Sequence, residues 1–158
     1  MCAPIVMTRS GSMPNSEGRA AFGAGVASGS RRTLKSAPII AFVATINPDA
    51  ARTFYAGTLG LRLVSEDGFA LSFDAAGTML RVAIVRELQP AGYTVLGWTV
   101  PDIRHATRDL VKRGVAFQRY EFLDQDKDGV WTLPGGAKVA WFKDPDGNTL
   151  SLTEFKDE

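Results

Sequence analysis

Cysteine, histidine and long hydrophobic runs are nearly missing from this chain of 158 residues. The only cysteine is Cys2 and the only histidine is His105. No internal disulfide can therefore form, and no thiol in the core can act as a nucleophile or metal ligand. A Ser-His-Asp triad would depend on that one histidine, and the sequence has no glycine-rich phosphate loop.

The sequence also has no hydrophobic run near the roughly 20 residues that a membrane helix requires. Its formal net charge is +1, so the chain lacks the excess of basic residues that nucleic-acid-binding proteins carry. Hydrophobic residues make up 45% and charged residues 22%, enough for one domain with a real core. We therefore expect a soluble, cytoplasmic protein that binds neither membrane nor nucleic acid.

Residues 1–36 differ from the rest in composition. They carry five basic residues against Glu17 alone and are rich in Gly, Ser and Ala, so they cannot bury enough apolar surface to offset their ordering entropy. The segment is predicted to be a flexible N-terminal extension that folding does not need. Two alternatives are an organelle transit peptide and, from Arg31-Arg32, an export signal, although the apolar stretch that follows is short and is needed as a strand.

Two segments about 53 residues apart repeat each other. Asn47-Pro48-Asp49 opens a helical pattern that ends at Leu59-Gly60-Leu61, and Val100-Pro101-Asp102 opens another that ends at Gly114-Val115. Each follows an apolar run and precedes strand-like segments. The repeat predicts a domain at 37–156 with module one at 37–90 and module two at 91–156.

Turn residues and apolar periodicity place the elements of each module. Asn47 is a good N-cap with Pro48 at the first helical position, and Gly60 ends that helix. The second helix should bury Ile103, Ala106, Leu110 and Val111. The predicted strands are 39–46, 61–65, 69–73, 79–85, 94–100, 115–122, 138–142 and 149–155. The fold class is α+β, with two βαβββ modules forming a curved mixed sheet around a cleft and helices on the outer faces.

This pattern resembles the vicinal oxygen chelate superfamily, which includes glyoxalase I, extradiol dioxygenases and bleomycin-resistance proteins. The resemblance rests on the duplication, on Phe54-Tyr55 with Leu59-Gly60-Leu61, and on the closing Asp144-Pro145-Asp146-Gly147-Asn148. It implies a ligand cleft between the two halves and a homodimer. In metal-dependent members, His, Gln or Glu from the first and last strands of each half bind a divalent ion in that cleft.

The corresponding positions do not carry metal-binding side chains. They are Ile40 or Phe42 and Arg81 in module one, and Val95 and Ser151 in module two. The apolar side chains have no donor, Ser is a weak ligand, and Arg brings a fixed positive charge. We therefore expect no divalent metal and no other cofactor.

An organic ligand is predicted instead. Arg81 and Ser151, on pseudo-equivalent strands, should face one cleft, where an Arg suits a carboxylate or phosphate. Strand alternation adds Met79, Ala83, Thr149 and Thr153 to the same face. The alternative is that Arg81 bends to the rim and pairs with an acidic neighbour, as most strand arginines do.

Three further signals have competing interpretations. Asp124 to Gly129 matches half of an EF-hand loop, but Gly135 stands where the bidentate Glu belongs, so an acidic hairpin or lid loop is expected. His105 should lie solvated on the polar side of its helix. Trp131 is the best candidate to stack on a planar ligand, whereas Trp98 alternates with core positions.

Three functions stay open at this point. The first is a bleomycin-resistance-like protein that binds a small organic molecule, such as an anionic one, without a metal. The second is a metal-independent isomerase or lyase in which Arg81 stabilises negative charge; its general base is unknown. The third is a protein-interaction module whose cleft is filled by its own side chains.

Overall fold

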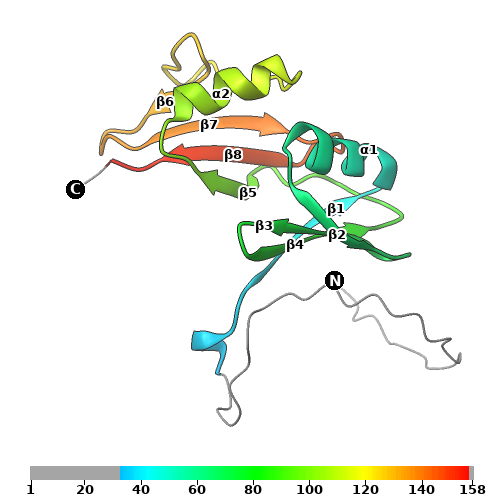
Figure 1. Ribbon diagram of the computed structural model, residues 1–158. Helices are drawn as coiled ribbons and strands as arrows, with labels where there is room; N and C mark the ends of the chain where they lie inside the picture. The colour runs from blue at the N-terminus through cyan, green and yellow to red at the C-terminus, as the bar shows by residue number, and fades with distance from the viewer. Residues whose placement is uncertain (1–32, 157–158) are drawn as a thin grey trace, which may run out of the picture.

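The computed structural model describes residues 33–156, which form two four-stranded sheets with helices on one side (Figure 1). Most of the predicted N-terminal extension lies outside the described residues. Within them, a short 3-10 helix at Leu34–Ser36 precedes the first strand. No helix in residues 33–156 is both long and apolar enough to cross a membrane.

The first module follows the predicted βαβββ order. Its elements are β1 (Ile40–Thr45), α1 (Pro48–Arg52) with a π-helical continuation η2 (Thr53–Thr58), β2 (Arg62–Glu66), β3 (Ala70–Ala75) and β4 (Thr78–Ile84). The Asn47 side chain accepts a hydrogen bond from the Ala50 amide at 3.1 Å, which fixes the start of the helix. Gly60 ends it with φ of 76°, a conformation that favours glycine. The sheet order is β1-β4-β3-β2, with β1 parallel to β4.

The second module repeats this order. It contains β5 (Thr94–Thr99), α2 (Ile103–Lys112), β6 (Trp131–Thr132), β7 (Lys138–Lys143) and β8 (Thr149–Glu154), in the sheet order β5-β8-β7-β6. Asp102 caps α2 by accepting from the His105 amide at 2.9 Å. The predicted α+β class and the duplication are therefore confirmed.

Two local predictions are wrong. Residues 115–122 do not form a strand: apart from an isolated bridge between Phe117 and Phe142, they run as a loop. Val111 is exposed, and Thr107 is buried in the α2 stripe instead. Burial of this threonine is tolerated because its hydroxyl donates to the Arg104 carbonyl at 3.1 Å.

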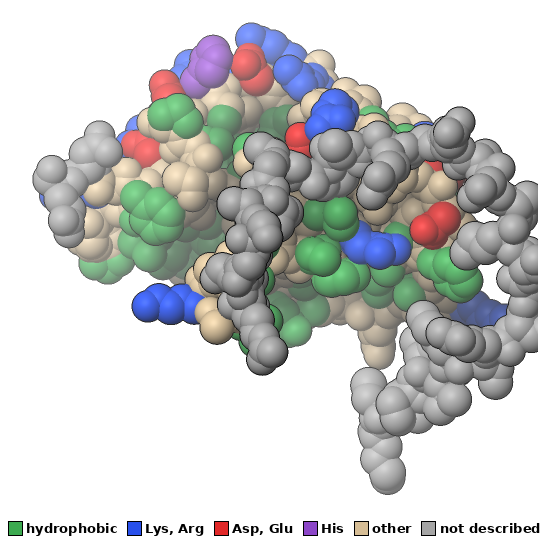
Figure 2. Space-filling model, turned by 60° about the horizontal axis from the view of Figure 1, so that its bottom comes forward, with side chains coloured by type: hydrophobic (Ala, Val, Ile, Leu, Met, Phe, Trp, Pro, Cys, Tyr) green, Lys and Arg blue, Asp and Glu red, His purple; other side chains and the backbone are tan. Residues whose placement is uncertain are grey.

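One core lies between the helices and the sheet faces that they cover. It contains Val43, Tyr55, Leu71, Phe73, Leu80, Val82, Ile103, Ala140, Phe142, Leu150 and Leu152. Strand alternation turns the neighbouring residues to the opposite, open face of the sheets. Figure 2 shows this side of the molecule, where hydrophobic side chains are gathered while charged groups cluster along the upper margin.

The turn between β7 and β8 makes hydrogen bonds to the first module, and Figure 1 places α1 beside it. Its Asp144 carboxylate accepts a 2.8 Å hydrogen bond from the Tyr55 hydroxyl. Asp146 accepts from the Thr45 hydroxyl and the Ile46 amide, and the Asn148 amide group donates to the Ala44 carbonyl. The predicted turn is confirmed by the Gly147 amide, which donates to the Asp144 carbonyl at 3.0 Å.

Candidate functional site

A cavity of about 380 Å³ opens on the open face of the second module, and we call it the aromatic pocket. It is built from the end of the linker between the modules, the first residue of β5, the loop after α2, and the strands β6 to β8. Its lining consists of Gly92, Tyr93, Thr94, Tyr120, Phe122, Leu123, Trp131, Trp141 and Thr149. Rings and hydroxyls therefore make up most of its wall.

Two tryptophans form the floor of the aromatic pocket. Trp131 and Trp141, on adjacent strands, stack with ring centroids 6.1 Å apart and an interplanar angle of 27°. Tyr120 meets Trp141 edge-on at 5.5 Å. The Trp141 indole N–H donates to the Thr94 hydroxyl at 3.1 Å, so the ring is fixed at both ends.

The rim carries two more aromatic rings. Tyr93 is 71% exposed and Phe122 is 82% exposed. Neither packs into the core, and an exposed cluster of large rings beside a cavity is typical of a ligand-binding surface.

The loop that carries Tyr120 and Phe122 is held by Gln125. Its side-chain oxygen accepts from the Tyr120 amide at 2.7 Å, and its side-chain nitrogen donates to the carbonyls of Gln118 and Gly129. This one side-chain amide thus closes the loop, together with the isolated bridges of Phe117 to Phe142 and of Gln125 to Trp131. This is why residues 115–122 keep a fixed course although they form no strand.

The acidic segment Asp124 to Gly129 is an ion-paired loop. Asp126 accepts from the amides of Asp128 and Val130 and from the Arg104 guanidinium, each within 3.0 Å. Burial alone would raise the pKa of Asp126, but these hydrogen bonds outweigh it and hold the pKa below its usual range. The Arg104 guanidinium is thus the cation that pairs with this carboxylate. The predicted acidic hairpin or lid loop is thus a short, closed hairpin.

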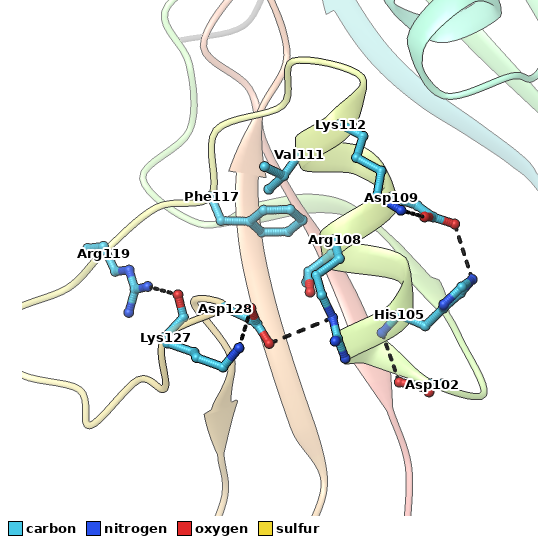
Figure 3. A pocket seen from close by; sticks show the side chains of 11 residues that line it. Asp102, His105, Arg108, Asp109, Val111, Lys112, Phe117, Arg119, Lys127 and Asp128 are labelled. Carbon is cyan, nitrogen blue, oxygen red and sulfur yellow. Dashed lines mark hydrogen bonds and ion pairs between the residues drawn. The ribbon is translucent and has the colours of Figure 1, made fainter.

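A second, charged cavity of about 550 Å³ lies between this loop and α2 (Figure 3). The figure shows Arg108 and Asp128 pointing toward one another across it, and the pair is 3.9 Å apart. His105 lies at its edge with a 73% exposed side chain, 3.1 Å from Asp109. The prediction of a solvated histidine is confirmed. The lining contains both acidic and basic side chains, whose charges offset one another. The cavity therefore does not favour a ligand of either charge.

The residues predicted to line the cleft are divided between the two modules. Trp131 and Thr149 lie in the aromatic pocket. Ser151 and Thr153 continue the same face of β8, and Ser151 is buried against Gly97. A Cβ atom at position 97 would come within 2.6 Å of the Ser151 hydroxyl oxygen. The close approach of these strands therefore requires glycine at position 97.

Ile40, Phe42, Met79 and Arg81 lie on the open face of the first module, where β1 and β4 pair Ile40 with Met79 and Phe42 with Arg81. Arg81 is 4.0 Å from Asp67 at the β2–β3 turn, and its side chain is 35% exposed. This contact is the salt bridge to an acidic neighbour that was the alternative interpretation of Arg81 in the sequence. Arg81 does not line the aromatic pocket or the charged cavity.

Val95 lies at a register shift in β5, between Thr94 and Leu96, and packs partly buried against the core. The prediction for Val95 rested on counting back from the helix start, and because of the shift Gly97 is the residue beside Ser151. The positions expected to hold a divalent ion are Ile40 or Phe42, Arg81, Val95 and Ser151, and among them only the serine hydroxyl could bind a cation. This donor set does not fit a divalent metal.

Four aromatic residues of the pocket were not among the predicted site residues: Tyr93, Tyr120, Phe122 and Trp141. The sequence signal was their concentration in the second module. It could not be used because the loop that brings Tyr120 and Phe122 to β7 was interpreted as a strand. Trp98, in contrast, stacks on the core residue Phe142 at 6.4 Å, as the alternation predicted.

The comparisons with known proteins agree with the duplicated fold. Residues 39–152 match the model of the Glyoxalase/Bleomycin resistance protein/Dioxygenase superfamily. A superfamily member from Sphaerobacter thermophilus is similar, with 25% identity over 75% of this chain and 98% of its own, and a TM-score of 0.57. A glyoxalase family protein from Enterococcus faecalis has 23% identity over 77% of this chain and 98% of its own, with a TM-score of 0.59.

A lactoylglutathione lyase from Agrobacterium tumefaciens has 18% identity over 75% of this chain and 93% of its own, with a TM-score of 0.56. At this identity the likeness shows the fold alone. No protein with a curated description matches the chain. The family match, which covers most of the described residues, and the two βαβββ modules lead to one conclusion: the chain belongs to the Glyoxalase/Bleomycin resistance protein/Dioxygenase superfamily.

Proposed function

We propose that this protein binds a planar aromatic small molecule in the aromatic pocket and does not transform it. The observation that carries the proposal is the stacked pair Trp131–Trp141 with Tyr120 edge-on, in a cavity of about 380 Å³. Such walls favour stacking with a ring, and each aromatic contact contributes about 0.5–1.5 kcal/mol beyond buried area.

The chemistry of the lining favours binding over catalysis. None of the nine lining residues is Asp, Glu, His, Lys or Arg, so the pocket offers no side chain that could serve as a general base near neutral pH. Its polar groups are hydroxyls, and one of them, on Thr94, already accepts from Trp141. Hydroxyls can orient a ligand without changing it.

The ligand is inferred to be uncharged. An anionic ligand was expected because of Arg81, yet Arg81 lies on the first module beside Asp67. The open space in the pocket also supports a binder over an interaction module with a filled cleft.

Isothermal titration calorimetry tests the proposal with neutral ring compounds such as naphthol, quinoline and anthraquinone. Replacing Trp131 with alanine should weaken the tightest of them at least about tenfold, because one face of the stack is lost. Trp98→Phe is the matched control, since Trp98 packs on the core side of the sheet. Equal affinity of the wild type and the Trp131→Ala variant would overturn the assignment.

A homodimer is the second part of the proposal. The open face of β1 exposes Ile40 to 49% and Phe42 to 61%, and a second copy would remove these side chains from water. Light scattering after size exclusion should give twice the monomer mass for the wild type and a lower mass for Phe42→Asp. A wild type that stays monomeric at high concentration would contradict this part alone.

A further inference from the structure

We propose that a second ligand site lies on the opposite side of the sheet from the aromatic pocket, and that it takes a small apolar molecule with one carboxylate, such as a medium-chain fatty acid. The site is a cavity of about 290 Å³ between the end of η2 and α2. It is independent of the proposed aromatic ligand.

The wall of this back cavity is almost wholly apolar. Leu59 and Leu61 come from the first module, Ala106 and Leu110 come from α2, and Trp98 comes from β5. Val100, Phe142 and Leu152 complete the apolar lining. These side chains belong to the core or pack against it, so the cavity is a gap at the core edge where the helices of the two modules meet.

An apolar cavity of this kind is better filled by hydrocarbon than by water. Water needs two to four polar partners, whereas the polar lining is limited to Thr99, Asp109 and Arg113 at the mouth. At about 30 Å³ per small group, the volume suits on the order of ten non-hydrogen atoms. Burying such a chain gains about 0.8 kcal/mol per methylene.

The charges at the mouth favour an anion. Arg113 is exposed, and within residues 33–156 its guanidinium makes one hydrogen bond, from Nη1 to the Thr58 carbonyl at 3.2 Å. The guanidinium also lies over Gly60, since a Cβ there would be 3.7 Å from the same Nη1. Its remaining N–H groups are available to a carboxylate at the mouth.

The one acidic residue at the mouth is already compensated. Asp109 accepts from the Lys112 ammonium at 3.3 Å and lies 3.1 Å from His105. The Lys112 hydrogen bond, with the charges of His105, Lys112 and Arg113, lowers the pKa of Asp109. Arg113 is the cationic side chain in the lining of the apolar cavity. A fatty acid would place its chain among the leucines and its carboxylate on Arg113.

The sheet separates this site from the aromatic pocket. Consecutive residues of β7 point to opposite sides: Trp141 lines the aromatic pocket and Phe142 lines the back cavity. A substitution in α2 can therefore change one site without touching the other.

Calorimetric titration of the full chain with octanoate, which has about ten non-hydrogen atoms, tests the inference. Ala106→Leu should fill the cavity and weaken octanoate binding at least about tenfold. Arg113→Gln should weaken octanoate about three- to tenfold, the modest effect expected at an exposed charge, and leave octanol binding unchanged. Arg108→Gln is the matched control on the same helix, because its side chain lines the charged cavity.

Two results would overturn the inference. The first is an octanoate affinity that is unchanged in Ala106→Leu while circular dichroism shows the variant folded. Leu59→Phe, which fills the cavity from the other module, gives the same test if Ala106→Leu does not fold. The second is that octanoate does not bind the wild type, or that its binding is lost in Trp131→Ala. Loss in that variant would assign the binding to the aromatic pocket.

Discussion

The hydroxyl of Tyr55, in the first module, donates to the Asp144 carboxylate of the second module at 2.8 Å, and both residues are buried. Burial raises the pKa of the Tyr55 hydroxyl, and the negative charge of Asp144 raises it further. The phenol is therefore a permanent donor. Asp144 also accepts from Asn148 and from two turn amides, so this carboxylate connects the modules and shapes the turn.

Replacing Tyr55 with phenylalanine should lower the free energy of unfolding by about 1–2 kcal/mol, because Asp144 keeps its other donors. Asp144→Ala should cost more, about 3 kcal/mol, because it leaves the Tyr55 hydroxyl, the Asn148 side chain and the turn amides without their acceptor. Urea denaturation measures both. Equal losses would show that the contact between the modules, and not the turn, is the main contribution.

Gly97→Ala should destabilise the protein by about 1–3 kcal/mol, because the new methyl group would meet the Ser151 hydroxyl oxygen. Ser151→Ala removes that oxygen, and the Ser151 Cβ is 3.9 Å from the added atom. The double variant should thus recover part of the loss, although the Ser151 carbonyl at 3.3 Å remains. If the change in melting temperature of the double variant equals the sum of the two single changes, the two residues do not clash directly.

Gln125→Ala should weaken aromatic ligands more than it changes stability. The loss of three hydrogen bonds frees the loop that carries Tyr120 and Phe122, and the ligand must then order it again on binding, at about tenfold lower affinity. Titration calorimetry and a thermal melt separate the two effects. Gln118→Ala, whose carbonyl remains as acceptor, is the matched control.

The hydrogen bonds that Asp126 accepts from the Val130 amide and the Arg104 guanidinium should make stability depend on pH in the acid range. Because the folded pKa of Asp126 lies below its usual value, ionised Asp126 stabilises the folded state above about pH 4, and this contribution is lost as the pH falls through the lowered pKa. Asp126→Asn should therefore be less stable than the wild type at pH 7, by about 1 kcal/mol, and this difference should shrink as the pH falls through the lowered pKa. A constant difference across this range would exclude the linkage.

Arg81→Met should change the free energy of unfolding by less than about 0.5 kcal/mol, because its pair with Asp67 is long and partly exposed. Aromatic ligands should bind this variant as they bind the wild type. A tenfold loss of affinity would extend the binding site into the first module.

The sequence was sufficient for the fold because the duplicated caps and turns are local signals. Asn47, Asp102 and the Asp144–Gly147 turn each form contacts with residues a few positions away, and such contacts do not depend on the rest of the fold. The bounds of the other predicted elements accordingly came out close to those observed, whereas 115–122 forms no strand and β6 was not predicted.

The site was less predictable because it depends on contacts that no periodicity reveals. The loop at 115–130 is held by the side chains of Gln125 and Arg104 and by two isolated bridges, and not by a continuous strand pairing, so its apolar residues imitated a strand. The register shift at Val95 likewise moved a position that was assigned by counting.

The β3–β4 turn and the β7–β8 turn lie at equivalent places in the repeat, but their aspartates contact different parts of the molecule. In the first module Asp74 bonds only nearby groups, the Gly77 amide and the Arg62 guanidinium of the adjoining strand, whereas its counterpart Asp144 reaches Tyr55 in the other half. The halves are consequently no longer interchangeable. A chain built from two copies of the second half would have a buried carboxylate without its phenol. The two halves therefore have different roles in the contact that holds them together.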